Sequence, residues 1–153
     1  MKATSNRRTF IAGAGGVAAG ILAGPGRADA AEWSEAETAN VRIVNDFCAA
    51  WATRDLARTL PFLAADCVYR MTETTAPATG HDGVTNRLKP TVDRSTRVEF
   101  KVLDTFAAGP IVINHRIDQF VSYRPLTWEG VGVFFVKDGK IKEWSDYTIR
   151  VNR

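Results

Sequence analysis

The sequence predicts an α+β domain in which a curved, antiparallel or mixed β-sheet wraps around N-terminal helices and leaves an internal pocket. Two observations lead to this prediction. Apolar residues recur at helical spacing between residues 35 and 53, and from residue 97 onward apolar and polar residues alternate as they do in strands. Helices followed by a run of strands is the element order of the α+β class.

Residues 1–30 precede this domain and are predicted to be an export signal. The pair Arg7-Arg8 is followed by an uncharged run over residues 10–26, and Ala28-Asp29-Ala30 offers the small residues of a cleavage site. The arginine pair resembles the twin-arginine motif, which implies the Tat export machinery and a bacterial protein that is periplasmic or secreted. A retained anchor is the alternative, but the run is shorter than the roughly 20 apolar residues of a membrane span. We therefore expect a signal peptide over 1–30, a domain over 31–153, and no stable membrane anchoring after the signal is removed.

Composition argues against a nucleic-acid partner. The chain has a net charge of +3 at pH 7, but this excess lies in the first thirty residues, and residues 31–153 hold equal numbers of basic and acidic side chains. A domain without net charge lacks the electrostatic footprint of a nucleic-acid binder. A hydrophobic fraction of 45% is also too high for intrinsic disorder.

The helical part begins at Ser34-Glu35-Ala36-Glu37, which has the spacing of a capping box. Apolar residues then follow at steps of three or four: Val41, Val44, Phe47, Cys48 and Trp51. This pattern predicts a helix over about 35–53. Asp55 is expected to cap a short second helix that runs through Leu60 and Leu63.

The segment between the helices and the long strands predicts shorter elements. Residues 67–71 have the composition of a first strand, and residues 72–80 are expected to form a loop. A short helical piece is predicted over about 84–88, and Pro90 is expected to end it. His81 precedes this piece in a turn and is expected to be an exposed loop residue.

Four long strands are predicted in the last third of the chain. Val98, Phe100 and Val102 alternate with polar residues, and the break at Gly109-Pro110 ends this first strand. Three further strands are expected over 111–123, 127–136 and 140–151. The last two are joined by Asp138-Gly139, a dipeptide that is favoured in tight hairpins because both of its residues tolerate positive φ.

Polar residues occupy positions in these strands where apolar residues are expected. Arg116 and Asp118 share one face of the strand over 111–123 with Val112 and Phe120, and Asp146 lies between aromatic and polar residues in the last strand. Burial of charges costs several kcal/mol per ion unless they are paired. The pattern therefore predicts either a compensated network or a polar cavity, whereas an ordinary ion pair on a solvated sheet is the alternative.

The combination of these motifs resembles a known family. Three segments carry the resemblance: Asn114-His115-Arg116-Ile117-Asp118, Trp144-Ser145-Asp146-Tyr147 after a glycine-containing hairpin, and Val68-Tyr69 earlier in the chain. In this order and spacing they resemble the limonene-1,2-epoxide hydrolase family, whose members have the cone-shaped NTF2-like fold. The resemblance extends over about residues 35–150 and implies an NTF2-like cone for this domain.

The resemblance also implies a cofactor-independent reaction, in which a small hydrophobic epoxide is hydrolysed by water in one step. Asp118 corresponds to the acid that protonates the epoxide oxygen, Arg116 to the bridge, Asp146 to the base, and Tyr69 to a group that holds the water. The family places an Asn two residues after this tyrosine, but the present chain has Met71. Met cannot donate a hydrogen bond, so the water loses one orienting contact.

Elementary electrostatics predicts the same protonation state. An aspartic acid that donates a proton near neutral pH needs a pKa raised by roughly three units, and burial beside a second carboxylate is able to raise it. Two ionised carboxylates around one arginine would leave one negative charge in a partly apolar pocket. We therefore expect Asp118 and Asp146 to share one proton near neutrality.

Aromatic residues and Met71 are predicted to form the pocket wall: Phe47, Trp51, Phe120 and Trp144. His81 and His115 lie far apart in the sequence without a third ligand, so no metal site is predicted. His115 is expected to pack on the face opposite Arg116. Two alternatives stay open for Cys48 and Cys67, namely a disulfide in an exported protein and two free core thiols.

Other readings of the same residues stay open. A SnoaL-like cyclase or isomerase would use one carboxylate to abstract a proton next to a carbonyl, which needs no fixed water, so Met71 makes this reading more credible. A non-catalytic periplasmic small-molecule binding domain is a third reading, since fold alone does not determine function. A homodimer through Trp128, Phe135 and the outer sheet face is also expected, as the family usually forms one.

Overall fold

The structure is a computed structural model in which residues 32–152 are described. The predicted signal peptide over 1–30 lies outside the described residues, and export of the protein stays a prediction. Within residues 32–152, no helix is both long and apolar enough to cross a membrane.

The first helix, α1 (Glu35–Ala50), forms where the sequence predicts it. The Ser34 hydroxyl accepts a hydrogen bond from the Glu37 N–H, and the Glu37 carboxylate accepts one from the Ser34 N–H at 2.8 Å, so the capping box is complete. The helix ends at Ala50 and continues as a 3-10 turn, η1 (Trp51–Thr53). The buried residues of α1 are Val41, Val44, Phe47 and Cys48, as predicted, and the fifth predicted residue, Trp51, is buried in η1.

The prediction of a second helix after Asp55 is wrong, because this segment forms short 3-10 turns. Residues 55–62 form two separate 3-10 turns, η2 (Leu56–Arg58) and η3 (Leu60–Phe62), and Leu63 begins the first strand. Asp55 caps the first turn through the Ala57 N–H, as predicted. A proline in the second turn lacks the N–H that a continuous α-helix would use, which limits this segment to short turns.

The helix α2 (Gly80–Arg94) is much longer than predicted and passes through Pro90. Its buried residues Val84, Leu88 and Val92 repeat every four positions and pack the helix against the strands. This burial outweighs the hydrogen bond that proline removes, because Pro90 lies on the exposed side. The expectation that Pro90 ends the helix is therefore wrong.

The residues before and at the start of α2 differ from the prediction in two ways. The expected loop contains a short strand, β2 (Ala78–Thr79), which pairs antiparallel with β1 (Leu63–Arg70). His81 is half-buried at the first turn of α2, with Nε2 3.2 Å from the Leu63 carbonyl oxygen, so it is not an exposed loop residue.

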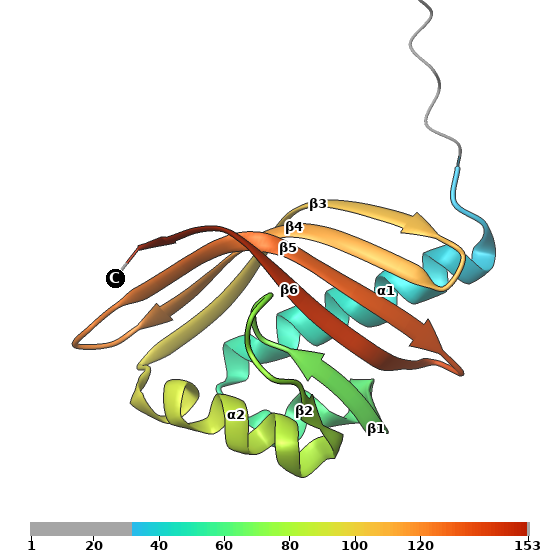
Figure 1. The fold of residues 1–153 in the computed structure, drawn as a ribbon. Coiled ribbons are helices and arrows are strands. Elements are labelled where there is room, and N and C mark those ends of the chain that lie inside the picture. Colours follow the sequence, from blue (N-terminus) through green and yellow to red (C-terminus); the bar gives the residue numbers. More distant parts are fainter. Residues whose placement is uncertain (1–31, 153) are drawn as a thin grey trace, which may run out of the picture. The chain divides into compact units, whose positions relative to one another are not determined.

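The sheet has the strand order β2-β1-β6-β5-β4-β3. The four long strands are β3 (Arg97–Ala108), β4 (Ile111–Val121), β5 (Leu126–Lys137) and β6 (Lys140–Asn152). Only the pair β1–β6 is parallel, so the sheet is mixed. Figure 1 shows the long strands arching over α1, with α2 on the same side. The predicted α+β architecture is thereby confirmed.

The hairpin between β5 and β6 turns as predicted. Asp138 and Gly139 have φ values of 51° and 71°, which is the left-handed conformation that a tight hairpin requires. A β-bulge follows the turn, because Val136 pairs with Ile141 but Phe135 pairs with Glu143. The turn and this bulge together place Trp144 opposite Phe134 and Asp146 opposite Gly132.

The two faces of the sheet differ in character. The inner face joins α1 and α2 in one core that contains Phe47, Trp51, Phe134 and Trp144. The outer face leaves large apolar side chains exposed: Phe106, Phe135, Tyr147 and Ile149. A second copy of the chain is expected on this face, and the homodimer stays a prediction.

Candidate active site

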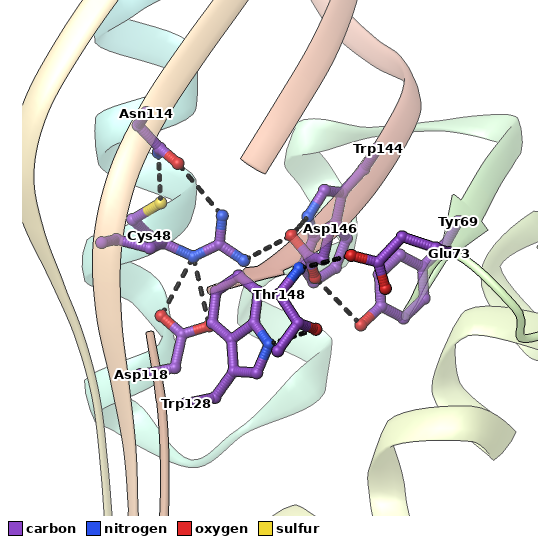
Figure 2. Close-up of polar contacts among 10 residues, drawn as sticks. Cys48, Tyr69, Glu73, Asn114, Asp118, Trp128, Trp144, Asp146 and Thr148 are labelled. Atoms are coloured by element: carbon purple, nitrogen blue, oxygen red, sulfur yellow. Dashed lines mark hydrogen bonds and ion pairs between the residues drawn. The ribbon is translucent and has the colours of Figure 1, made fainter. Parts of the chain in front are cut away.

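The inner face of the sheet gathers the polar residues that the sequence singles out. Burial alternates strictly along β4, and Asn114, Arg116 and Asp118 fall on the buried side. Tyr69 comes from β1 and Asp146 from β6, and Figure 2 shows the hydrogen bond between these two side chains. The exposed fractions are 0% for Arg116, 4% for Asp118, 5% for Asp146 and 3% for Tyr69. An ion pair on a solvated sheet is therefore excluded.

Arg116 binds both carboxylates, and we call Asp118, Arg116 and Asp146 the carboxylate–arginine trio. Nε of Arg116 donates to the two carboxylate oxygens of Asp118 at 3.0 and 3.2 Å, and Nη2 of Arg116 donates to Oδ1 of Asp146 at 2.6 Å. Nη1 donates to Oδ1 of Asn114 at 3.0 Å. A planar guanidinium with donors on several edges is suited to bridging two carboxylates in this way.

The two carboxylates have different environments. Asp118 accepts hydrogen bonds only from Arg116 among the described residues. Asp146 also accepts from the Trp144 indole at 2.7 Å and from the Tyr69 hydroxyl at 3.3 Å. Donors stabilise the ionised form of a carboxylate, so Asp146 is the better anion and Asp118 the better proton carrier.

Burial is the main influence on the titration of both carboxylates. Burial raises the pKa of Asp118 to about 7; the Arg116 cation opposes this effect and Asp146 adds to it. Burial also raises the pKa of Asp146, although Arg116, Trp144 and Tyr69 counteract it. Burial disfavours the charge of Arg116, but the two carboxylates outweigh this effect and raise its pKa above the ordinary value, so it stays protonated. The expected coupled pair is thus supported by both burial and charge.

Trp128 is a site residue that the sequence reasoning missed. It was expected on the outer face, but β5 pairs it with Asp118, and its ring lies 4.9 Å from the Arg116 guanidinium carbon. Its indole N–H donates to the Thr148 hydroxyl at 3.0 Å, and the Thr148 N–H donates to the Glu73 carboxylate at 2.7 Å (Figure 2). The even spacing from Trp128 to the core residue Phe134 was the available signal for an inward position.

Two glycines of β5 make room for this arrangement. A Cβ on Gly132 would lie 1.9 Å from Nη1 of Arg116 and 2.8 Å from the Asn114 side-chain oxygen. A Cβ on Gly130 would lie 2.2 Å from the Trp128 ring. The strand therefore has glycine at the two positions where the arginine and its covering indole approach the backbone.

The family model of the SnoaL-like domain matches residues 44–144. The chain belongs to the SnoaL-like family. This match includes the end of α1, all of α2 and the strands β1 to β5, with Arg116 and Asp118 on β4, and it ends in β6 two residues before Asp146. No curated protein matches the sequence.

Solved structures place this SnoaL-like domain among NTF2-like cones. An LEH-like epoxide hydrolase of M. tuberculosis is 27% identical, with a TM-score of 0.62 over 73% of this chain and 84% of that chain. A putative SnoaL-like polyketide cyclase from Jannaschia sp. CCS1 is 17% identical, with a TM-score of 0.66 over 77% and 90% of the two chains. The second likeness shows the fold alone. The NTF2-like fold expected from the sequence is confirmed.

The other expected pocket residues divide into core and pocket. Phe47 and Trp51 are fully buried, and their rings pack edge-on against Trp144 at 5.0 and 6.0 Å. Met71 follows β1 directly and is half-buried against the same core. Of the five residues expected in the pocket wall, Phe120 is the one that lines a cavity at the hairpin end of β4 and β5.

A cavity of about 870 Å³ lies at the hairpin end of β4 and β5. Phe120 lines it and shares a face with Asp118, two residues earlier on β4. The three trio residues do not line it.

The histidines and cysteines of the described residues have structural positions. His115 points away from the trio, and its Nε2 lies 3.2 Å from the Glu129 carboxylate. Cys48 and Cys67 are free and buried, and burial raises the pKa of each thiol to about 12. Within residues 32–152, no cluster of three or more His, Cys, Asp or Glu side chains could hold a metal ion.

Proposed function

We propose that this SnoaL-like domain hydrolyses a small hydrophobic epoxide to a vicinal diol in one step. The observation that carries the proposal is a single buried arginine that holds two carboxylates in unequal environments. One carboxylate is prepared to give a proton and the other to take one, which is what concerted epoxide opening by water requires.

In the proposed step, Asp118 donates its proton to the epoxide oxygen while the carbon–oxygen bond breaks. A water attacks the ring carbon and loses a proton to Asp146, so that one epoxide and one water give one diol. Arg116 keeps its charge and holds both groups in position. The trio carries the same net charge before and after the step, and a proton returns to Asp118 between turnovers.

Tyr69 is a candidate water ligand in this reaction. Its hydroxyl donates to Asp146, and burial raises the pKa of Tyr69 well above its ordinary value, so the phenol stays protonated. A protonated phenol next to the base can orient a water that the base deprotonates. The likeness to the LEH-like epoxide hydrolase of M. tuberculosis is consistent with this assignment.

A SnoaL-like cyclase or isomerase is the second candidate, and Met71 favours it. This residue is half-buried two positions after Tyr69, where the epoxide hydrolase resemblance implies an asparagine. Abstraction of a proton next to a carbonyl needs a carboxylate base and a donor for the enolate, which Asp146 and Tyr69 supply without an ordered water.

The deciding experiment uses the purified protein in ¹⁸O-labelled water with a panel of terpene, cyclic and aryl epoxides. Hydrolysis predicts a diol that carries one ¹⁸O atom, detected by mass spectrometry. A cyclase or isomerase would leave the epoxides unchanged and would instead exchange the acidic C–H protons of ketone substrates with D₂O. Absence of diol across the panel contradicts the hydrolase proposal.

The pH dependence of the rate is a first prediction. The pKa of Asp118 is about 7, so the proton it must donate is present below this pH and lost above it. We expect kcat/KM for epoxide opening to fall about tenfold per pH unit above neutrality. A rate that is unchanged between pH 6 and pH 9 would contradict the role of Asp118 as the acid.

The same pKa shift predicts the pH dependence of stability. The folded pKa of Asp118 is raised above the value of 3.8 in an unfolded chain. Between about pH 4 and pH 7 the unfolded chain releases this proton while the folded protein keeps it, so the contribution to stability is lost as pH rises. The difference in unfolding free energy between the wild type and Asp118→Asn, measured in urea, should change in this window and not above it.

Met71→Asn tests the water contact directly. If the reaction is hydrolysis, an amide at this position adds a donor and an acceptor for the attacking water, and we expect faster diol formation by severalfold. Met71→Leu is the matched control, since it changes the side chain without adding a polar group. Faster turnover of a ketone substrate in place of diol formation would favour the cyclase or isomerase hypothesis.

A further inference from the structure

We propose that the cavity at the hairpin end of β4 and β5 binds the carboxylate of the substrate, so that the natural substrates are epoxides of aliphatic acids and not uncharged epoxides. This inference rests on the proposed function and names the substrate class of the same site. It follows from two arginines at the cavity rim, from the apolar wall between them and the trio, and from the distance along β4.

The apolar wall begins next to the proposed acid. Phe120 lies on the buried face of β4, two residues after Asp118, and pairs across the hairpin with Leu126 of β5. Both side chains line the cavity of about 870 Å³. A hydrocarbon chain that leaves the trio at Asp118 therefore passes over apolar side chains.

The far rim of the cavity is cationic. Arg94 comes from the last turn of α2, Arg124 comes from the turn between β4 and β5, and both line the cavity. No acidic residue lines it. Among the described residues neither arginine forms an ion pair, and the nearest carboxylate in the sequence, Asp93, is paired with Lys89 at 2.9 Å.

The two serines of the rim already donate to backbone carbonyls. The Ser95 hydroxyl donates to the Thr91 carbonyl at 2.8 Å, and the Ser122 hydroxyl donates to the Arg124 carbonyl at 2.6 Å. Stabilisation of the helix C-terminus explains a cation at Arg94, but it does not explain one at Arg124, which lies in a turn. The two guanidinium groups are the charged donors at this rim, beside the hydroxyls of Thr91 and Tyr123, and a planar guanidinium suits a carboxylate.

The strand sets the distance between the anion and the reacting group. Four residues separate Asp118 from Ser122 at the rim, which corresponds to about 14 Å along an extended antiparallel strand. A substrate that spans this distance carries its carboxylate several carbon atoms away from the epoxide. The terminal epoxide of 10,11-epoxyundecanoic acid has this form, and its methyl ester lacks only the charge.

The first test compares kcat/KM for diol formation from the acid and from its methyl ester. We expect the wild type to prefer the acid, and Arg94→Gln and Arg124→Gln each to reduce this preference roughly three- to tenfold, chiefly through KM. The double variant should treat acid and ester alike. Arg42→Gln, which removes an exposed arginine on α1 outside the cavity, controls for the change in net charge.

The outcomes separate this inference from the proposed function. The rate of diol formation from the ester measures the activity of the trio. The ratio of kcat/KM for the acid to kcat/KM for the ester measures the contribution of the two rim arginines. Equal rates for acid and ester in the wild type, or a ratio that is the same in the double variant, would overturn the carboxylate site and leave the hydrolase intact. If neither compound is hydrolysed, calorimetry with dodecanoate decides: binding lost in the double variant but kept in Arg42→Gln supports the site, and any other result overturns it.

Discussion

Asp118→Asn is expected to reduce diol formation by about 10²- to 10⁴-fold while the protein stays folded. The amide still accepts the hydrogen bond from Nε of Arg116, and the trio loses no volume, but it can no longer donate a carboxylic acid proton. The measurement is kcat for the epoxide that the labelled-water panel identifies, with circular dichroism to verify the fold. Asp104→Asn, at an exposed position on β3, is the matched control.

Asp146→Asn tests the second carboxylate of the proposed mechanism. One-step hydrolysis needs both the acid and the base, so we expect this variant to lose diol formation to a similar extent. A cyclase or isomerase uses a single base, and one of the two carboxylates would then be dispensable. Retention of more than half the wild-type rate in either variant would refute the two-carboxylate mechanism.

Gly132→Ala is expected to give the second large effect. The added Cβ would lie 1.9 Å from Nη1 of Arg116, so the buried guanidinium must move away from the carboxylates it bridges. Disruption of a buried ion pair costs roughly 3–5 kcal/mol, and we expect a loss of this order in the free energy of unfolding in urea, together with loss of activity. The disruption lies in the fully buried centre of the domain, where solvent cannot compensate for it.

Gly83→Ala is the matched control for this substitution. Gly83 lies inside α2, and a Cβ there would meet its nearest atom at 3.5 Å, an ordinary contact. Alanine is more favourable than glycine within a helix by about 0.8–1.0 kcal/mol, so the same chemical change should stabilise the protein. Equal effects of the two substitutions would contradict the role of Gly132 in making room for the arginine.

The elements that the sequence predicts correctly have local causes. Ser34 and Glu37 specify the start of α1 because a capping box needs only four consecutive residues. Asp138 and Gly139 specify the last hairpin because only their own φ angles matter. Alternation along β4 assigned Arg116 and Asp118 to one face, because the side-chain period of a strand is two.

The elements that the sequence predicts wrongly depend on distant contacts. Pro90 indicates a helix end, but α2 continues to Arg94 because Val84, Leu88 and Val92 are buried by other elements. The strand β2 exists only because β1 lies beside it, and two residues carry too little pattern to reveal this. Trp128 is the exception, since its even spacing from Phe134 along the same strand already indicated an inward position.

The amino-acid pattern is enough to show which residue types share a strand face: Arg116 with Asn114 and Asp118 on β4, and Asp146 with Trp144 on β6. The three-dimensional fold is needed to show that these faces meet, that Arg116 is fully buried between the two carboxylates, and that Asp118 has fewer donors than Asp146. The physical reason is that face assignment follows from the period of one strand, whereas burial and unequal hydrogen bonding arise where β1, β4, β5 and β6 come together.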